Sequence, residues 1–246
     1  MTMAGRRVLI TGGGSGVGAS LARGFAAAGA EVVIAGRQLE SLQRTAAGHA
    51  NIRAVVSDVT DEASVKAMFA AAGPCDIVIA NAGAADSAPF AKTTLEQWNA
   101  MLAVNLTGVF LTLREGLIQM PGWGRLIAVA STAGLKGYPY VAAYTAAKHG
   151  VVGLTRALAL EVAKKPITVN AICPGFLDTE MTERSIATIA AKTGRSAQDA
   201  RAAFAANNPQ NRLIAPGEVT ATALWLCSPG SEGVNGQAIA ISGGEA

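Results

Sequence analysis

The sequence predicts an α/β fold in which a doubly wound parallel sheet of about seven strands carries helices on both faces. Short apolar runs recur along the 246 residues, and alanine-rich stretches of helical length separate them. Most of these runs are continuously apolar rather than alternating, which is typical of strands buried on both faces of a parallel sheet. Because 50% of the residues are hydrophobic, the chain can bury the core that such a sheet needs. We expect residues 1–246 to form a single domain.

The apolar runs and the stretches between them define the expected elements in order. Strands are expected at Arg7–Thr11, Glu31–Ala35, Arg53–Ser57, Asp76–Ala80, Arg125–Ala130, Thr168–Cys173 and Gln237–Ile241. Helices are expected at Val17–Ala28, Ser64–Ala72, Leu95–Leu117, Tyr144–Ala163 and Glu218–Leu226. In such a sheet a ligand binds outside the carboxyl ends of the strands, so functional residues should follow the strands in the sequence.

Residues 176–211 depart from this alternation, because they follow the sixth strand and do not lead directly into another. Their composition predicts helices joined by polar turns. A helical excursion beside the ligand crevice is expected to form a lid over the substrate. A purely structural excursion is the alternative.

Charge and cysteine content narrow the possible partners. Lys and Arg number 20 against 17 Asp and Glu, a balance of +3 that does not favour nucleic acid and suits a small anionic ligand. Cys75, Cys173 and Cys227 lie far apart in apolar stretches, which predicts buried thiols in a reducing compartment and no metal site. No apolar stretch reaches the roughly 18 residues of a membrane-spanning helix, and no secretion signal is evident. We therefore expect a cytoplasmic protein with no membrane or nucleic-acid partner.

A glycine-rich segment, Thr11-Gly12-Gly13-Gly14-Ser15-Gly16-Val17-Gly18, connects the first expected strand to the first expected helix. Glycines permit a tight turn and a close approach of backbone to a pyrophosphate, and the free amides of a helix N-terminus attract phosphate. An ordinary glycine turn is the alternative, but a preceding strand and a following helix are the context that dinucleotide binding requires. The cofactor-binding residues expected in this segment are Thr11, Gly12, Ser15, Gly16, Val17 and Gly18.

The ends of the second and third strands bear on the choice of cofactor. Where an acidic residue would hold the ribose of NAD, the chain has Gly36 followed by Arg37, which can pair with the 2′-phosphate of NADP. NADP(H) is therefore favoured over NAD(H), and a solvated Arg37 with either cofactor is the alternative. Asp58, followed by Val59, is expected either to accept from the adenine amino group or to cap the helix that starts near Asp61.

Tyr144 and Lys148 are one helical turn apart, so their side chains lie on one face of the expected helix. A surface pair is the alternative for an isolated motif of this kind. Here, however, Ser131 ends the fifth strand and Asn105 lies in the preceding helix. The four side chains can therefore meet at the carboxyl edge of the sheet.

Together these motifs resemble the short-chain dehydrogenase/reductase family over essentially the whole chain. The resemblance includes the glycine-rich segment, the Tyr144/Lys148 pair and Ser131, which stands 13 residues before Tyr144. It implies a Rossmann-like domain, usually assembled as a homotetramer, that binds NAD or NADP. The catalytic residues that it implies are Asn105, Ser131, Tyr144 and Lys148. The cofactor-binding residues that it adds are Asn81, Ala82, Gly83, Tyr144, Lys148, Pro174, Gly175 and Thr179.

The chemistry of these side chains agrees with hydride transfer to a carbonyl carbon. A nearby ammonium stabilises a phenolate, so Lys148 is expected to lower the pKa of Tyr144 from its usual value of about 10. Tyr144 would then exchange a proton with the substrate oxygen, and Ser131 would hold that oxygen by a hydrogen bond. Lys148 is also expected to bind the nicotinamide ribose, Asn105 to anchor a proton-relaying water, and Thr179 to orient the nicotinamide.

The C-terminal part of the chain, from Asn208–Leu213 to Ser242-Gly243-Gly244, is similar to reductases of 3-oxoacyl thioesters. This resemblance implies a 3-oxoacyl/3-hydroxyacyl pair on coenzyme A or a carrier protein, whose phosphates could meet the lid cations Arg184, Lys192 and Arg195. Aryl ketones, polyols, steroids and sugars stay open as alternatives. Two further classes are a non-catalytic cofactor-binding regulator and an isomerase or dehydratase that returns the hydride.

Overall fold

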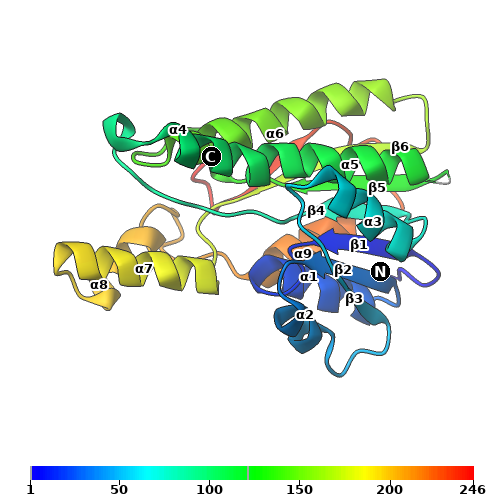
Figure 1. Ribbon diagram of the computed structural model, residues 1–246, viewed down its shortest axis with the longest axis horizontal. Helices are drawn as coiled ribbons and strands as arrows, with labels where there is room; N and C mark the ends of the chain where they lie inside the picture. Colours follow the sequence, from blue (N-terminus) through cyan, green and yellow to red (C-terminus); the bar gives the residue numbers. More distant parts are fainter. Residues whose placement is uncertain (1, 121) are drawn as a thin grey trace.

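The computed structural model describes residues 2–120 and 122–246 and confirms the predicted fold class (Figure 1). Within these residues, seven parallel strands form one sheet in the order β3-β2-β1-β4-β5-β6-β7. The chain runs outward from β1 to β3 and then crosses to the other side of β1, where β4 begins the second half. The topological switch point therefore lies between β1 and β4, and ligands of doubly wound sheets bind there.

The strands begin and end within one or two residues of their predicted bounds. They are β1 Arg7–Thr11, β2 Glu31–Gly36, β3 Ile52–Val56, β4 Ile77–Ala80, β5 Gly124–Val129, β6 Ile167–Pro174 and β7 Ala238–Ile241. In the register, Val8 pairs with Val32 of β2 on one side and with Ile77 of β4 on the other. The strands β4, β5 and β6 are buried at every position, as their continuous apolar runs predict.

The helices include the five predicted ones, the helices expected within residues 176–211, and α2. They are α1 Gly16–Ala27, α2 Leu39–Ala46, α3 Glu62–Ala72, α4 Leu95–Leu102, α5 Gly108–Gln119, α6 Ala142–Glu161, α7 Glu180–Thr193, α8 Ala197–Ala205 and α9 Pro216–Leu226. The prediction of one helix over Leu95–Leu117 is wrong in one respect: the π-helical segment η2, Ala103–Thr107, separates α4 from α5. The helix α2 was not predicted, because it is a short, polar segment with only Leu42 and Thr45 buried.

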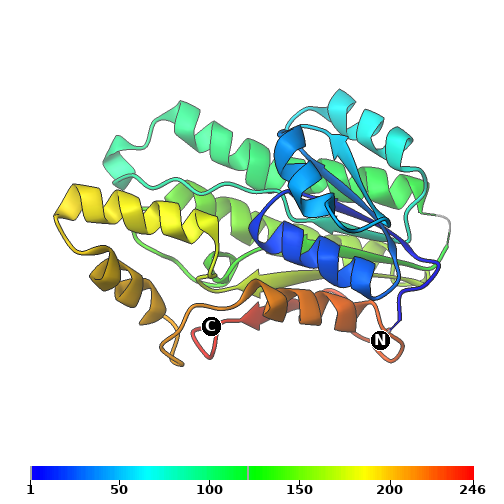
Figure 2. The ribbon, with the colours of Figure 1, turned by 90° about the horizontal axis from the view of Figure 1, so that it is seen from below.

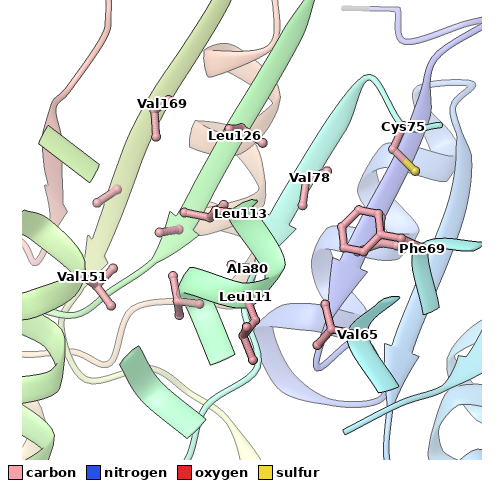
Figure 3. Close-up of a cluster of buried hydrophobic side chains, with 14 of the residues drawn as sticks. Val65, Phe69, Cys75, Val78, Ala80, Leu111, Leu113, Leu126, Val151 and Val169 are labelled. Carbon is pink, nitrogen blue, oxygen red and sulfur yellow. The ribbon is translucent and has the colours of Figure 1, made fainter. Parts of the chain in front are cut away.

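Each face of the sheet carries its own apolar layer. In β1, Val8 and Ile10 pack on the face that α1 and α9 cover, whereas Leu9 packs on the opposite face. The second layer joins α3, α5 and α6 to the strands, and Figure 3 shows Phe69 of α3 and Leu113 of α5 among its members. The helices α1 and α9 pack side by side on the first face (Figure 2). These two layers hold the carboxyl ends of the strands in fixed positions beneath the loops.

The predicted excursion after β6 forms the helices α7 and α8, which project from one end of the molecule (Figures 1 and 2). Its two ends are joined where Leu177 forms a parallel bridge with Ile214. The Asp178 amide donates to the Ile214 carbonyl at 2.9 Å, and the Ile214 amide donates to the Phe176 carbonyl at 2.9 Å. The helical pair is thus a hairpin with a closed base beside the sheet.

One expectation about membranes needs correction. By length and composition alone, the helical run Leu95–Gln119 is apolar enough to cross a membrane. In the fold, its C-terminal half is α5, which packs against β4 and β5 in the core. Burial against the sheet therefore explains the apolar residues of α5 such as Val109, Leu111 and Leu113.

Candidate active site

A cavity of about 230 Å³ opens at the carboxyl ends of β1, β4, β5 and β6. It lies at the switch point, where the fold places a ligand. Most residues predicted for catalysis or cofactor binding line it. These are Gly12, Ser15, Gly16, Val17, Gly18, Asn81, Ala82, Gly83, Asn105, Ser131, Tyr144, Lys148, Pro174, Gly175 and Thr179.

The glycine-rich segment forms one wall of the cavity. Gly12 and Gly16 adopt φ values of 67° and 50°, which favour glycine at both positions. A Cβ atom on Gly18 would overlap the carbonyl oxygen of Gly12, so glycine is needed for α1 to start this close to β1. Ser15 precedes α1 without capping it through its side chain, and the first turn carries no acidic residue. The amides at this helix end therefore suit the pyrophosphate of a dinucleotide.

Thr11 does not line the cavity but holds its neighbouring wall. The buried Thr11 hydroxyl accepts hydrogen bonds from the amides of Asn81 at 3.0 Å and Ala82 at 3.1 Å. The Asn81 side chain donates in turn to the Thr11 carbonyl at 2.9 Å. Thr11 thus joins the loop after β4 to the glycine-rich segment, and its predicted contact with a cofactor stays a prediction.

Asn105 lies in the π-helical segment, with its side chain fully buried. Its amide group donates to the Ala84 carbonyl at 2.9 Å and to the Met101 carbonyl at 3.1 Å, and its oxygen accepts from the Ala84 amide at 3.2 Å. From the π-helical segment, the Asn105 side chain therefore holds the loop after β4. Such segments are frequent at functional sites.

Tyr144 and Lys148 lie in the first turns of α6 and face the cavity together with Ser131. The Lys148 ammonium lies 5.6 Å from the centre of the Tyr144 ring and donates to the Val129 carbonyl at 2.9 Å. A side-chain hydrogen bond connects Tyr144 with Ser131. The predicted convergence of Ser131, Tyr144, Lys148 and Asn105 on one cavity is thus what the structure contains.

The ionisation of Tyr144 differs from the prediction. Burial raises the pKa of Tyr144, and the hydrogen bond with Ser131 only partly opposes this effect. The expected net lowering by Lys148 is therefore wrong for the protein alone. The same burial acts on both groups: it disfavours the charged form of Tyr144, and it lowers the pKa of Lys148 to about 8.

The lid contributes the wall opposite the glycine-rich segment. Thr179 precedes α7 in extended conformation and does not cap it through its side chain. A Cβ on Gly16 would approach the Thr179 methyl group at 3.4 Å, so the start of α7 lies close to the start of α1. The N-termini of α1 and α7 therefore face the same cavity. The α7 end carries Glu180 and Glu183 in its first turn, so the α1 end, which has no acidic residue there, is the one that suits an anionic ligand.

Arg37, Asp58 and Val59 lie outside the cavity, beyond β2 and β3. Arg37 is exposed, and its charge helps to lower the pKa of Asp58, although hydrogen bonds from Thr60 contribute more. The alternative that Asp58 caps a helix is wrong, because Asp61 caps α3 and accepts from two of its amides. The adenine role of Asp58 stays a prediction.

Several residues of the cavity were not predicted as site residues. They are Ala84, Val129, Ala130, Leu177, Glu180, Met181 and Arg184. Val129 ends β5 and Ala130 follows it, and both were predicted only as strand residues, whereas Arg184 was considered only as a lid cation. Of the other lid cations, the Lys192 side chain lies outside the described residues, and Arg195 is exposed on the lid.

The cysteines are buried and unpaired by disulfides, as predicted. Burial raises the pKa of Cys75 and Cys173 to about 11 and that of Cys227 to about 12, so all three are thiols at neutral pH. Across the described part of the chain, no group of three His, Cys, Asp or Glu residues could hold a metal ion.

Proton-transfer side chains beside a phosphate-binding loop are typical of oxidoreductases on this fold, and comparison with known proteins agrees with that class. The family model described as short chain dehydrogenase matches residues 6–190. The chain belongs to the short-chain dehydrogenase/reductase family and is an oxidoreductase. The alternative of a non-catalytic regulator is accordingly set aside.

Individual relatives cover almost the whole chain. The chain is 37% identical to a protein assigned as ketoacyl reductase 1 of the granaticin polyketide synthase from Streptomyces violaceoruber, over 96% of this chain and 91% of the relative. It is 33% identical to D-beta-hydroxybutyrate dehydrogenase from Rhizobium meliloti, over 97% of this chain and 98% of the relative. Among solved structures, an actinorhodin polyketide ketoreductase variant with NADPH has a TM-score of 0.93 and 34% identity, covering 99% of both chains. Levodione reductase has a TM-score of 0.92 and 35% identity, covering 98% of both chains.

Proposed function

We propose that this enzyme reduces a carbonyl compound with NADP(H), and oxidises the secondary alcohol in reverse, with a 3-oxoacyl/3-hydroxyacyl thioester as its substrate pair. The observation that carries the proposal is the meeting of Ser131, Tyr144 and Lys148 with the glycine-rich segment in one cavity. A bound reduced nicotinamide would supply the hydride to the carbonyl carbon.

Tyr144 is the proton donor in this proposal. Because burial raises the pKa of Tyr144, its hydroxyl keeps a proton at neutral pH and can give it to the carbonyl oxygen. Ser131 holds the same oxygen, where negative charge develops, by a hydrogen bond. Asn105 supports the loop wall through Ala84 and anchors a water on the path to solvent.

Lys148 orients the cofactor and tunes Tyr144. With a pKa of about 8, its ammonium is mostly charged at neutral pH and can donate to ribose hydroxyls as well as to the Val129 carbonyl. When the Tyr144 hydroxyl has given up its proton, the same charge stabilises the phenolate. Gly12, Gly16 and Gly18 would hold the pyrophosphate, and Thr179 would contact the nicotinamide side.

The preference for NADP(H) rests on Arg37. Its exposed guanidinium follows β2, beyond Gly36, where a carboxylate would be expected in an NAD site. Arg37 would pair there with the 2′-phosphate of NADP. Asp58 lies close enough to Arg37 for their charges to interact and would accept from the adenine amino group.

The thioester substrate rests on similarity and on the charge of the cavity wall. Relatives include a protein assigned as a ketoacyl reductase and a D-beta-hydroxybutyrate dehydrogenase. Arg184 lines the cavity from the lid and can meet a carrier phosphate. A cyclic or aryl ketone is the second candidate, supported by the likeness to levodione reductase.

We further propose that the enzyme is a cytoplasmic homotetramer. Light scattering after gel filtration would test the oligomeric state.

A spectrophotometric screen tests the proposal. Oxidation of NADPH and of NADH is followed at neutral pH with acetoacetyl-CoA, the acyl-carrier form of acetoacetate, and a panel of simple and cyclic ketones. We expect turnover with a 3-oxoacyl thioester and a higher kcat/KM with NADPH. Turnover of cyclic ketones alone would replace the thioester assignment, and reaction of substrate without net oxidation of cofactor would favour an isomerase or dehydratase.

A further inference from the structure

Glu245 is an acidic residue that the fold buries beside the candidate site without giving it a part in the proposed chemistry. It lies four residues beyond the end of β7, and its side chain is only 3% exposed. The Lys136 ammonium lies 3.2 Å from Glu245 Oε1, and the Tyr138 hydroxyl donates a hydrogen bond to the same oxygen. A carboxylate is costly to bury, so its two partners have to hold it in place.

Tyr138 connects Glu245 to Thr132, the residue that follows Ser131. The Tyr138 hydroxyl is 2.7 Å from the hydroxyl of Thr132, which begins the short helix η3, Thr132–Gly134. Because Tyr138 donates to Glu245, the Thr132 hydroxyl donates to Tyr138. Burial and the Glu245 contact both raise the pKa of Tyr138, so its hydroxyl remains the donor over the whole working range of pH.

The second carboxylate oxygen points toward the base of the lid. Among the described residues, Glu245 Oε2 is buried without a hydrogen-bond partner. A Cβ atom on Gly175 would stand 3.1 Å from this oxygen, and Gly175 lines the cavity. The carboxylate thus fits against the turn from which the lid departs.

An aromatic series extends the contact into the lid itself. The rings of Tyr138 and Phe176 pack edge to face, with their centres 5.8 Å apart. The Phe176 ring packs in turn against Phe204 of α8, with a distance of 4.8 Å between the ring centres. Thr132, Lys136, Tyr138 and Glu245, which we call the Glu245 cluster, therefore touch both the Ser131 turn and the lid base.

We propose that Glu245 is a positioning residue for carbonyl reduction: through Tyr138 it fixes the Ser131 turn relative to the base of the lid. Ser131 and the lid contact opposite sides of a carbonyl substrate under the proposed function, on which this inference rests. A shift of about 1 Å between them can cost on the order of 10²-fold in rate. The contacts of the Glu245 cluster involve no residue of the glycine-rich segment, so the proposed pyrophosphate contacts are expected to be kept when Glu245 is changed.

The kinetic test compares Glu245→Ala, Tyr138→Phe and Glu245→Gln with the wild-type enzyme. Glu245→Ala and Tyr138→Phe should raise KM for the carbonyl substrate and lower kcat, giving a loss of about 10- to 100-fold in kcat/KM, with Kd for NADPH within about twofold of wild type. Glu245→Gln retains an acceptor for Tyr138 and should restore most of the activity. Glu161→Ala, which removes an exposed acid at the end of α6, is the matched control and should resemble wild type.

Amide hydrogen exchange in the protein without substrate provides a second readout. Exchange should become faster in residues 132–138 and 175–178 of Glu245→Ala and Tyr138→Phe, and stay unchanged in Glu161→Ala. Unchanged exchange there, wild-type KM in both variants, or a parallel loss of NADPH affinity would each overturn the inference. If the wild-type enzyme turned over no carbonyl compound, the proposed function would fail, while the exchange experiment would still decide whether Glu245 fixes the two segments.

Discussion

Lys148 lies in an environment that penalises its own charge. Desolvation lowers its pKa to about 8, and its ammonium donates to the Val129 carbonyl. The sequence identified Lys148 correctly as the neighbour of Tyr144 because residues four apart share a helix face. It could not reveal the burial that dominates the ionisation of both groups.

This burial has a measurable consequence for stability. Between about pH 8 and the reference value of 10.5, the unfolded chain keeps the proton on Lys148 that the folded protein has lost. Stability rises with pH wherever the unfolded state binds more protons. The free-energy cost of burying Lys148 therefore becomes smaller as the pH rises across this range. The unfolding free energy of wild type minus that of Lys148→Met should rise by on the order of 2 kcal/mol from pH 7.5 to 10, measured by urea denaturation. A constant or falling difference would contradict the assigned direction.

Under the proposed function, Arg37 determines the preference for NADP(H). Arg37→Ala should weaken NADPH binding about 10-fold or more, because a charge-assisted contact with a phosphate is lost, and should leave NADH binding nearly unchanged. Fluorescence titration with both cofactors measures the two dissociation constants. Arg44→Ala, which removes an exposed arginine in α2, serves as the control. Equal effects of Arg37→Ala on both cofactors would argue against contact with the 2′-phosphate.

At the scale of elements, the start of α1 depends on the missing side chain of Gly18. An alanine there would overlap the Gly12 carbonyl, which belongs to the rigid turn after β1. Gly18→Ala should therefore lower the unfolding free energy by about 2 kcal/mol and abolish detectable NADPH binding. Thermal unfolding and cofactor titration measure these effects.

The matched control for that substitution is Gly153→Ala in α6. A Cβ at Gly153 meets nothing within 4 Å, and the residue is exposed. Alanine has the higher helix propensity, so Gly153→Ala should stabilise the protein by roughly 0.5–1 kcal/mol and leave NADPH binding intact. If Gly18→Ala behaved like Gly153→Ala, the close approach of α1 to β1 would not be what the glycine provides.

The elements that the sequence predicted well are those with strong patterns. Continuous apolar runs located the central strands β4, β5 and β6, since burial on both faces leaves little choice of residue. The edge strands β3 and β7 were also located, although they are only partly buried. The π-helical segment around Asn105 escaped prediction because nothing in the apolar pattern distinguishes it from the α-helix on either side. Asp61 rather than Asp58 caps α3, a choice between two nearby acids that local sequence leaves open.

At the scale of the whole molecule, the sheet order brings together residues far apart in the chain. Asn81, Ser131 and Gly175 follow β4, β5 and β6, which are neighbours in the sheet, so they reach one cavity. This meeting was predictable from the alternation of strands and helices. The cluster around Glu245 was not, because it requires knowing that the segment after β7 returns to the turn after β5. Such long-range contacts are set by packing and leave no local pattern.

The most direct test of the proposed mechanism is to measure the cofactor affinity and the turnover of Tyr144→Phe. This variant keeps the ring beside Lys148 and removes only the hydroxyl proposed to carry the proton. We predict a Kd for NADPH within about twofold of wild type and a fall in kcat of about 10³-fold, in line with the loss of a general acid. Turnover close to that of wild type would contradict the central claim that the Tyr144 hydroxyl protonates the substrate.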